Sequence, residues 1–342
     1  MIQTMIVNLL TVSICSAISP NQLIALTKLQ MPRVPSLPNL EILTNLSREP
    51  LQMVYDYPTS VLYAWERLRV KTALIDGYFN MPLTLDELLT SDDQSPLEYE
   101  IIEKDDELNV DVYSHVQDPR FCLLYDTFGN IAGVRFSYLK SDVTSKAEAQ
   151  NLMFPYNYKN ISMFGSSIYW KKPVWYASIL FTSPENLMAG GREDTMGLAA
   201  EALYAKLDGV WVELPRDECD AEARGFVRQS CSLGKGMQYI YGMNRSLRCD
   251  DLQGLSLLYE NGHLVGAGLI TFGAPSCRDG CREWYESLSL GKFKKMVRNG
   301  PSCMTDWYKK YGVISLHIYL NRFPRFIMCN WPWQRKNRCK RL

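Results

Sequence analysis

Eight of the ten cysteines lie between residue 219 and the C-terminus, and this clustering limits how the second half of the chain can fold. In an oxidising compartment, cysteines at this density are typical of a disulfide framework. Zinc is the weaker interpretation, because Cys277 and Cys281 have no second pair or histidine at finger-like spacing, and we expect no metal. Disulfides are therefore predicted among Cys219, Cys231, Cys249, Cys277, Cys281, Cys303, Cys329 and Cys339.

The compartment follows from the first residues of the chain. The stretch from Met5 to Ala17 is uncharged and almost wholly apolar or small, and it ends in Cys15-Ser16-Ala17. A run this short cannot span a bilayer, and small residues at its end are typical of a signal peptide that is cleaved. The alternative is a buried N-terminal strand or helix. We expect cleavage after Ala17, a secreted, extracellular protein and no transmembrane anchor.

Removal of Cys15 with the signal peptide leaves nine cysteines, so one thiol should have no partner. Cys122 lies in the apolar run "FCLLYD", where a buried free thiol would be unremarkable. The alternative is Cys339 in the basic tail, either unpaired or bonded to another chain. Three sequons, at Asn45, Asn160 and Asn244, agree with secretion and predict a glycoprotein.

Helical and strand-like patterns alternate along the remaining sequence. Helices are predicted over 59–76, 195–207, 282–297 and 303–311. Strand-like runs include 121–139, 255–272 and 313–320. In "LLYENGHLVGAGLITF", Asn261-Gly262 favours a two-residue hairpin turn that sets Leu257 opposite Gly266 and Leu255 opposite Gly268. The two glycines would leave room for large neighbours to lie across the sheet.

These patterns predict an α+β protein, mostly antiparallel β-sheet with flanking helices, and a C-terminal part joined by disulfides. Four segments follow from them. The predicted segments are a signal peptide (1–17), an extended and helical segment (18–95), a β-rich α+β domain (96–329) and a basic tail (330–342).

Motifs for common cofactors and catalytic mechanisms are absent from the sequence. It has no P-loop, no G-x-S-x-G elbow and no H-E-x-x-H, and we expect no cofactor. Ser232-Leu-Gly-Lys235 matches S-x-x-K without the motifs that normally accompany it. Among the three histidines, His263 is expected to pair with Glu260 beside the hairpin turn, and His115 has no obvious partner.

His317 is the most informative of the three. In "VISLHIYL" the residues Ile314, Leu316, Ile318 and Leu320 form an apolar face that must be core. The opposite face carries Ser315, His317 and Tyr319, and it is either solvated or lines a cleft. If the protein is an enzyme, these three are the candidate catalytic residues, with His317 as general base because its ordinary pKa lies nearest neutrality.

The C-terminal end carries a dense positive charge. From Lys292 to Leu342 there are thirteen Lys and Arg against one acid, in a chain whose formal net charge is zero. The last residues are expected to form a mobile, exposed tail that either docks on the acidic body or binds an anionic polysaccharide or lipid surface rather than nucleic acid. The candidate anion-binding residues are Arg335, Lys336, Arg338, Lys340 and Arg341.

Three stretches carry a resemblance to other proteins. "LLYDTFGNIAGVRF", "LLYENGHLVGAGL" and "CMTDWYKKYGVISLHIYL" are similar to stretches in a loosely defined group of invertebrate secreted proteins. The resemblance covers about residues 113 to 320 and implies secretion and one β-rich unit. It assigns no function and no catalytic residue.

Three functions are compatible with the sequence. The first is a secreted, disulfide-bonded glycoprotein that binds a small apolar or aromatic ligand or a partner, using some of its many aromatic residues, which are 12% of the chain. The second is a secreted enzyme without a recognised cofactor motif, either a hydrolase or an oxygenase of luciferase type acting on an aromatic substrate. The third is an anionic-surface binder acting through the basic end.

Overall fold

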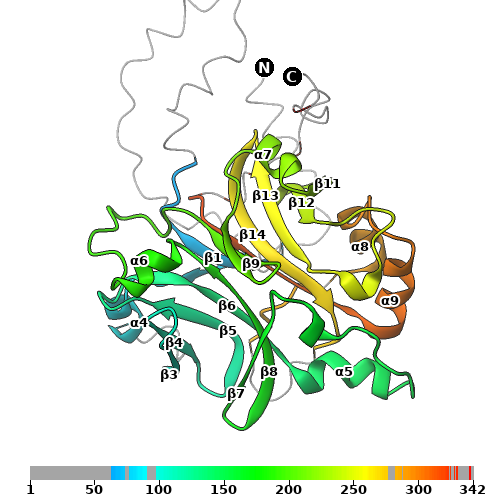
Figure 1. Cartoon of the computed structure of the whole chain (residues 1–342), viewed down its shortest axis with the longest axis horizontal. Helices are drawn as coiled ribbons and strands as arrows, with labels where there is room; N and C mark the ends of the chain where they lie inside the picture. Colours follow the sequence, from blue (N-terminus) through cyan, green and yellow to red (C-terminus); the bar gives the residue numbers. More distant parts are fainter. Residues whose placement is uncertain are drawn as a thin grey trace, which may run out of the picture. The chain divides into compact units, whose positions relative to one another are not determined.

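A computed structural model describes residues 63–73, 77–90, 98–275, 282–286 and 288–322, together with 324, 327, 329 and 339. The predicted signal peptide, the sequon at Asn45, both cysteines of the 277–281 segment and the tail cations lie outside these residues. The described strands pair antiparallel in two sheets, as the α+β prediction requires (Figure 1).

The first sheet holds the hairpin that the sequence predicts. Its strand order is β11-β12-β13-β14-β15-β1-β2, so the last strand of the chain lies between β14 and the first strand. The seven strands are β1 (Leu68–Ala73), β2 (Gly77–Met81), β11 (Phe226–Ser232), β12 (Gly236–Tyr241), β13 (Leu255–Glu260), β14 (His263–Phe272) and β15 (Val313–Tyr319).

The second sheet is built from the middle of the chain. Its order is β10-β9-β8-β6-β5-β4-β3, and β7 pairs with β8 outside this path. Its strands are β3 (Tyr99–Asp105), β4 (Val110–His115), β5 (Asp118–Tyr125), β6 (Ile131–Leu139), β7 (Gly165–Tyr169), β8 (Lys172–Leu180), β9 (Tyr204–Leu207) and β10 (Val210–Glu213).

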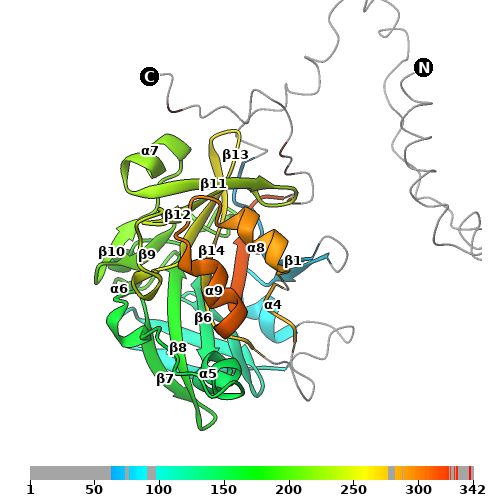
Figure 2. The same cartoon turned by 90° about the vertical axis from the view of Figure 1, so that its right-hand side faces the viewer.

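Short helices connect and cover the sheets. Two of them lie beside the first sheet, where α8 contacts β11 and α9 contacts β14 (Figure 2). The helices are α4 (Leu85–Thr90), α5 (Lys140–Glu148), α6 (Pro184–Met188), α7 (Glu218–Ala223), α8 (Leu290–Met296) and α9 (Cys303–Tyr311), with 3₁₀ turns η2 (Tyr158–Asn160) and η3 (Cys249–Asp251). One apolar cluster contains residues of both sheets and of α8 and α9, and burial of these side chains supplies the main driving force for folding.

The predicted helix over 59–76 is wrong, because its second half forms β1. Leu68 and Val70 are buried, and the strand pairs with β15 by setting Arg69 opposite Tyr319. The strand therefore depends on a partner about 250 residues away, and this long-range pairing outweighs a helical spacing that is only local. The same pairing places β1 and β2 in the β-rich sheet, although both lie before the predicted domain start at residue 96.

Two other helices are shorter than predicted or absent. Over 195–207 the chain is irregular and then enters β9. Arg192 donates to the carbonyls of Leu198 and Ala199, and the Ala199 N–H donates to the Trp65 carbonyl, so these backbone groups do not form helical hydrogen bonds. Over 282–297 only α8 is helical. In contrast, the helix predicted over 303–311 is confirmed as α9.

The β13–β14 hairpin is confirmed, with a register one residue away from the predicted one. Asn261 and Gly262 have φ of 51° and 90°, as their turn requires, and Glu260 lies opposite His263. A β-bulge then shifts the pairing, so that Leu258 faces Gly266 and Ser256 faces Gly268. Because of the bulge, the residue opposite Gly268 is Ser256 and not Leu255 as the sequence pattern predicted.

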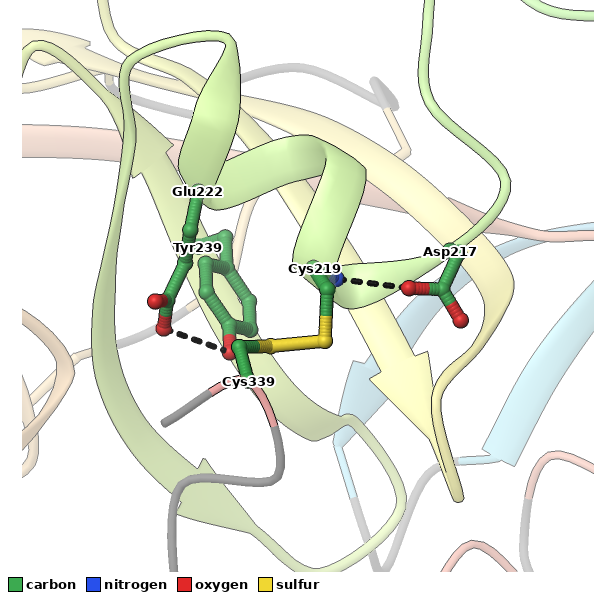
Figure 3. Close-up of a disulfide and its surroundings, with 5 residues drawn as sticks. All are labelled: Asp217, Cys219, Glu222, Tyr239 and Cys339. Atoms are coloured by element: carbon green, nitrogen blue, oxygen red, sulfur yellow. Dashed lines mark hydrogen bonds between the residues drawn. A yellow bond between two sulfur atoms is a disulfide. The ribbon is translucent and has the colours of Figure 1, made fainter. Parts of the chain in front are cut away.

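Among the described residues, three disulfides join the C-terminal part: Cys219–Cys339, Cys231–Cys329 and Cys249–Cys303. Within the same residues Cys122 is a buried free cysteine, as predicted, and Cys339 is not the leftover thiol. In Figure 3 the Cys219–Cys339 bond holds the chain end against α7, where the Asp217 side chain accepts from the N–H of Cys219. The Tyr239 hydroxyl donates to Glu222 of the same helix.

Candidate functional site

The most unusual polar group of the first sheet is His317, which is completely buried at the centre of β15. Its face of the strand is thus neither solvated nor part of an open cleft. The imidazole lies between Glu286 on one side, at 2.9 Å from Nδ1, and Ser256 on the other, at 3.1 Å from Nε2. Gln238 of β12 also contacts Nε2, through its amide nitrogen at 3.3 Å.

These contacts define which ring nitrogen carries the proton. The Glu286 carboxylate can only accept and lies 2.9 Å from Nδ1, closer than the Lys235 ammonium at 3.4 Å, so Nδ1 of His317 is assigned as the donor. Nε2 then acts as an acceptor, which matches the amide N–H of Gln238 and the hydroxyl of Ser256. Burial lowers the pKa of His317 below its ordinary value, and the attraction of Glu286 only partly opposes this effect. His317 is therefore a neutral imidazole near pH 7.

Glu286 is the centre of the network. It also accepts from Lys235 Nζ and from the Ser315 hydroxyl, and its own N–H donates to the Ser315 carbonyl at 2.8 Å. Burial alone would raise the pKa of Glu286, but His317 and Lys235 hold it well below the usual range. The carboxylate is thus ionised and Lys235 balances its charge, which makes the burial of both groups tolerable.

A glycine between two strands makes this geometry feasible. Ser256, Gly268 and His317 lie side by side across β13, β14 and β15, and so share one face of the sheet. A Cβ on Gly268 would stand 2.4 Å from Cδ2 of His317. The missing side chain is what lets the imidazole reach across β14 to Ser256.

A pocket of about 340 Å³ adjoins the network, because Glu286 belongs to its lining. Its walls come from 273–275, from 282–286 and Leu288, from Arg120 of β5 and Lys146 of α5, and from Tyr308 of α9 with the start of β15. Tyr285 and Tyr308 contribute half-buried aromatic rings, and their hydroxyls donate to the carbonyls of Ser137 and Leu288. The volume is at the lower end for small-molecule sites.

The short segment that carries Glu286 is fixed to both sheets. Trp284 Nε1 donates to Asp118 of β5 at 3.2 Å, and the same carboxylate receives the Arg120 guanidinium at 2.9 Å. Arg120 also bonds Asp142, and these two carboxylates raise its pKa although burial alone would lower it. The pocket wall is therefore held in place by bonds that leave Arg120 and Glu286 without unbalanced charge.

Ser256, His317 and Glu286 have the connectivity of a Ser-His-Glu triad. The serine hydroxyl contacts Nε2, and the carboxylate contacts Nδ1. A substrate could not reach the serine in this structure, since Ser256 is fully buried and neither Ser256 nor His317 lines the pocket. The arrangement seen here therefore supports a buried hydrogen-bond network more than a nucleophile open to substrate.

The structure brings together two of the three candidate catalytic residues. Ser315 and His317 meet at Glu286, whereas Tyr319 packs in a separate cluster, with its ring 5.1 Å from that of Tyr78. Sequence reasoning missed Glu286, Ser256 and Gln238. Lys235 was noticed only in S-x-x-K, and Ser232 of that motif lies exposed and outside the network.

The other predicted sites are only partly within the described residues. Asn160 and Asn244 are exposed, as glycosylation acceptors must be. His263 lies opposite Glu260 and also stacks on Tyr63, with ring centres 4.4 Å apart. The five tail cations are outside the described residues, but Cys339 among them is bonded to α7, whose first turn carries Glu218 and Asp220.

Comparison with known proteins gives no relative for this chain. No protein-family model, no curated protein and no solved structure matches it. Within the described ranges, no helix is both long and apolar enough to cross a membrane.

Proposed function

We propose that the protein is a secreted, disulfide-bonded glycoprotein that binds a small ligand with an aromatic or apolar part. The observation that carries the proposal is the pocket beside Glu286, with the rings of Tyr285 and Tyr308 in its walls. Those walls are fixed by bonds to both sheets, so little ordering would be required on binding.

Secretion is supported by the three disulfides, since such bonds persist in oxidising compartments. N-terminal sequencing of the protein released from expressing cells should begin at or near Ile18. Retention of Met1 in a cytosolic protein would contradict secretion. Mass shifts at Asn160 and Asn244 that disappear on glycosidase treatment would establish the glycoprotein.

Ligand binding is tested with two neutral aromatic probes, indole and phenylacetamide, by ligand-observed NMR. We expect wild-type protein to bind at least one of them, and Ala274→Trp to abolish that binding, because Ala274 lines the pocket and a large ring there fills it. Ala223→Trp is the matched control, since Ala223 is exposed on α7 and does not line the pocket. No binding to wild type, or binding that Ala274→Trp leaves unchanged, would refute the proposal.

A hydrolase is the second candidate, and the Ser256–His317–Glu286 geometry favours it. A fluorophosphonate probe, which labels activated serines, should then modify Ser256 in the folded wild-type protein. Labelling should be lost in His317→Gln. If folded protein stays unlabelled and shows no esterase activity, the network is structural and this candidate is excluded.

A further inference from the structure

The pocket carries two cations that form no ion pair with an acidic side chain of the described residues. Arg282 and Lys146 both belong to its lining, and within the described part of the chain neither forms an ion pair. The third lining cation, Arg120, is already bound by Asp118 and Asp142. Of the two lining acids, Glu286 is balanced by Lys235, and Glu283 is exposed and is not ion-paired with Arg282 or Lys146 among the described residues.

Arg282 is held by aromatic rings rather than by a carboxylate. Its guanidinium carbon lies 4.3 Å from the ring centre of Phe79 and 5.0 Å from that of Trp284. The carboxylate whose charge acts on the pKa of Arg282 is that of Asp118, and its two oxygens accept from Arg120 and Trp284. Burial lowers the pKa of Arg282, and Tyr99 and Asp118 oppose this only in part. A half-buried guanidinium without an anion keeps its N–H donors available, and an arginine fork matches a carboxylate.

Lys146 is placed in a similar way on another wall of the pocket. Its ammonium donates to the carbonyl of Tyr308 at 3.2 Å and lies 5.9 Å from the ring centre of the same residue. One hydrogen bond uses one of its three donors. The cations on α5 and on the 282–286 segment thus lie around a cavity that also has aromatic walls.

We propose that the ligand of this pocket is a small aromatic carboxylate, whose anionic group is bound by Arg282 and Lys146 while its ring packs against Tyr285 and Tyr308. This inference rests on the proposed ligand-binding function and names the chemical class of the ligand. A carboxylate would supply the counter-charge that the described residues do not provide to Arg282 and Lys146. An uncharged analogue would leave both cations partly desolvated without compensation.

The test compares phenylacetate with phenylacetamide, which have nearly the same size and shape and differ in charge. For wild-type protein we expect phenylacetate to bind about tenfold more tightly or better, because charge-assisted hydrogen bonds are the stronger kind. Arg282→Met keeps most of the apolar contact with Phe79 and Trp284 and should bring the ratio of the two affinities close to one. Arg282→Lys should preserve part of the preference for phenylacetate, and Lys146→Met should lower the ratio of the two affinities.

Arg298→Met is the matched control, since Arg298 is exposed and does not line the pocket. It removes the same charge and should leave the ratio unchanged. If phenylacetamide binds as tightly as phenylacetate, or if Arg298→Met lowers the ratio as much as Arg282→Met, the anion site is refuted although ligand binding stands. If indole binds wild type and neither of these two probes does, the anion site alone is refuted. If none of the three binds, both this inference and the proposed function are refuted.

Discussion

Replacement of Gly268 by alanine should destabilise the protein, because the added methyl group has no room. An ideal Cβ at this position would stand 2.4 Å from Cδ2 of His317 and 2.4 Å from the carbonyl oxygen of Leu316. Carbon atoms in contact normally lie about 3.5–4 Å apart. The Leu316 oxygen belongs to the neighbouring strand, and the imidazole is held by Glu286 and Ser256, so neither can move away without breaking hydrogen bonds.

The expected loss has two parts. Overpacking a well-packed core costs about 1–3 kcal/mol. Displacing His317 leaves a buried polar group of the network without its partner, which costs about another 1–3 kcal/mol. Gly268→Ala should therefore lower the free energy of unfolding by about 2–6 kcal/mol.

Gly291→Ala is the matched control for the same chemical change. Gly291 lies in α8, and no atom lies within 4 Å of the position that its Cβ would take. Alanine should stabilise the helix there by up to about 1 kcal/mol. Urea unfolding of the oxidised proteins, followed by tryptophan fluorescence, gives both values. A loss below about 1 kcal/mol for Gly268→Ala would refute the reasoning.

Four further predictions can be tested, three from the structure and the last, on the tail cations, from the sequence. The free energy of unfolding should fall by up to about 1.4 kcal/mol between pH 7.5 and 5.5 on account of His317. The unfolded chain takes up a proton on this histidine below about pH 6.5, whereas the folded chain, in which the pKa of His317 is lowered, does not. In urea titrations His317→Gln should remove this pH dependence and the control His263→Gln should keep it. Replacing Cys249 and Cys303 by alanine removes their disulfide and should lower the free energy of unfolding by about 3–4 kcal/mol. Burial raises the pKa of the Cys122 thiol to about 11, so this thiol should react with a thiol reagent only after the protein unfolds. Replacement of the five tail cations by glutamine should weaken retention on heparin resin at low salt, and unchanged retention would exclude the tail as an anion-binding site.

Local sequence patterns predicted the elements whose partners are close in the chain. The Asn261-Gly262 turn holds strands that pair within a few residues of it, and the alternation in 313–319 identified a strand with an apolar core face, although both of its faces are buried. Capping and apolar spacing likewise identified α9. These features are set by backbone preferences and by the period of apolar residues, both of which are visible in a short window.

Patterns failed where a distant partner decides the local conformation. Leu68–Ala73 has apolar residues at helical spacing, yet pairing with β15 makes it a strand. The backbone groups of 198–199 are bound by Arg192 and Trp65, so the helix predicted there cannot form its own hydrogen bonds. A single bulge in β14 changed the register by one residue and thereby changed which side chain faces Gly268.

The site shows most clearly why the sequence was insufficient. His317 was identified because only three histidines exist, but its partner had to be chosen from 37 acidic residues with no spacing to mark Glu286. That choice is made by the 282–286 segment, which Trp284 fixes to β5 and the Glu286 N–H fixes to β15. The same segment presents Arg282 to the pocket, so one short stretch supplies both a carboxylate that Lys235 balances and a cation that has no ion-pair partner among the described residues. Of these two charges, only the cation calls for a ligand, and this is why the pocket rather than the buried histidine carries the proposed function.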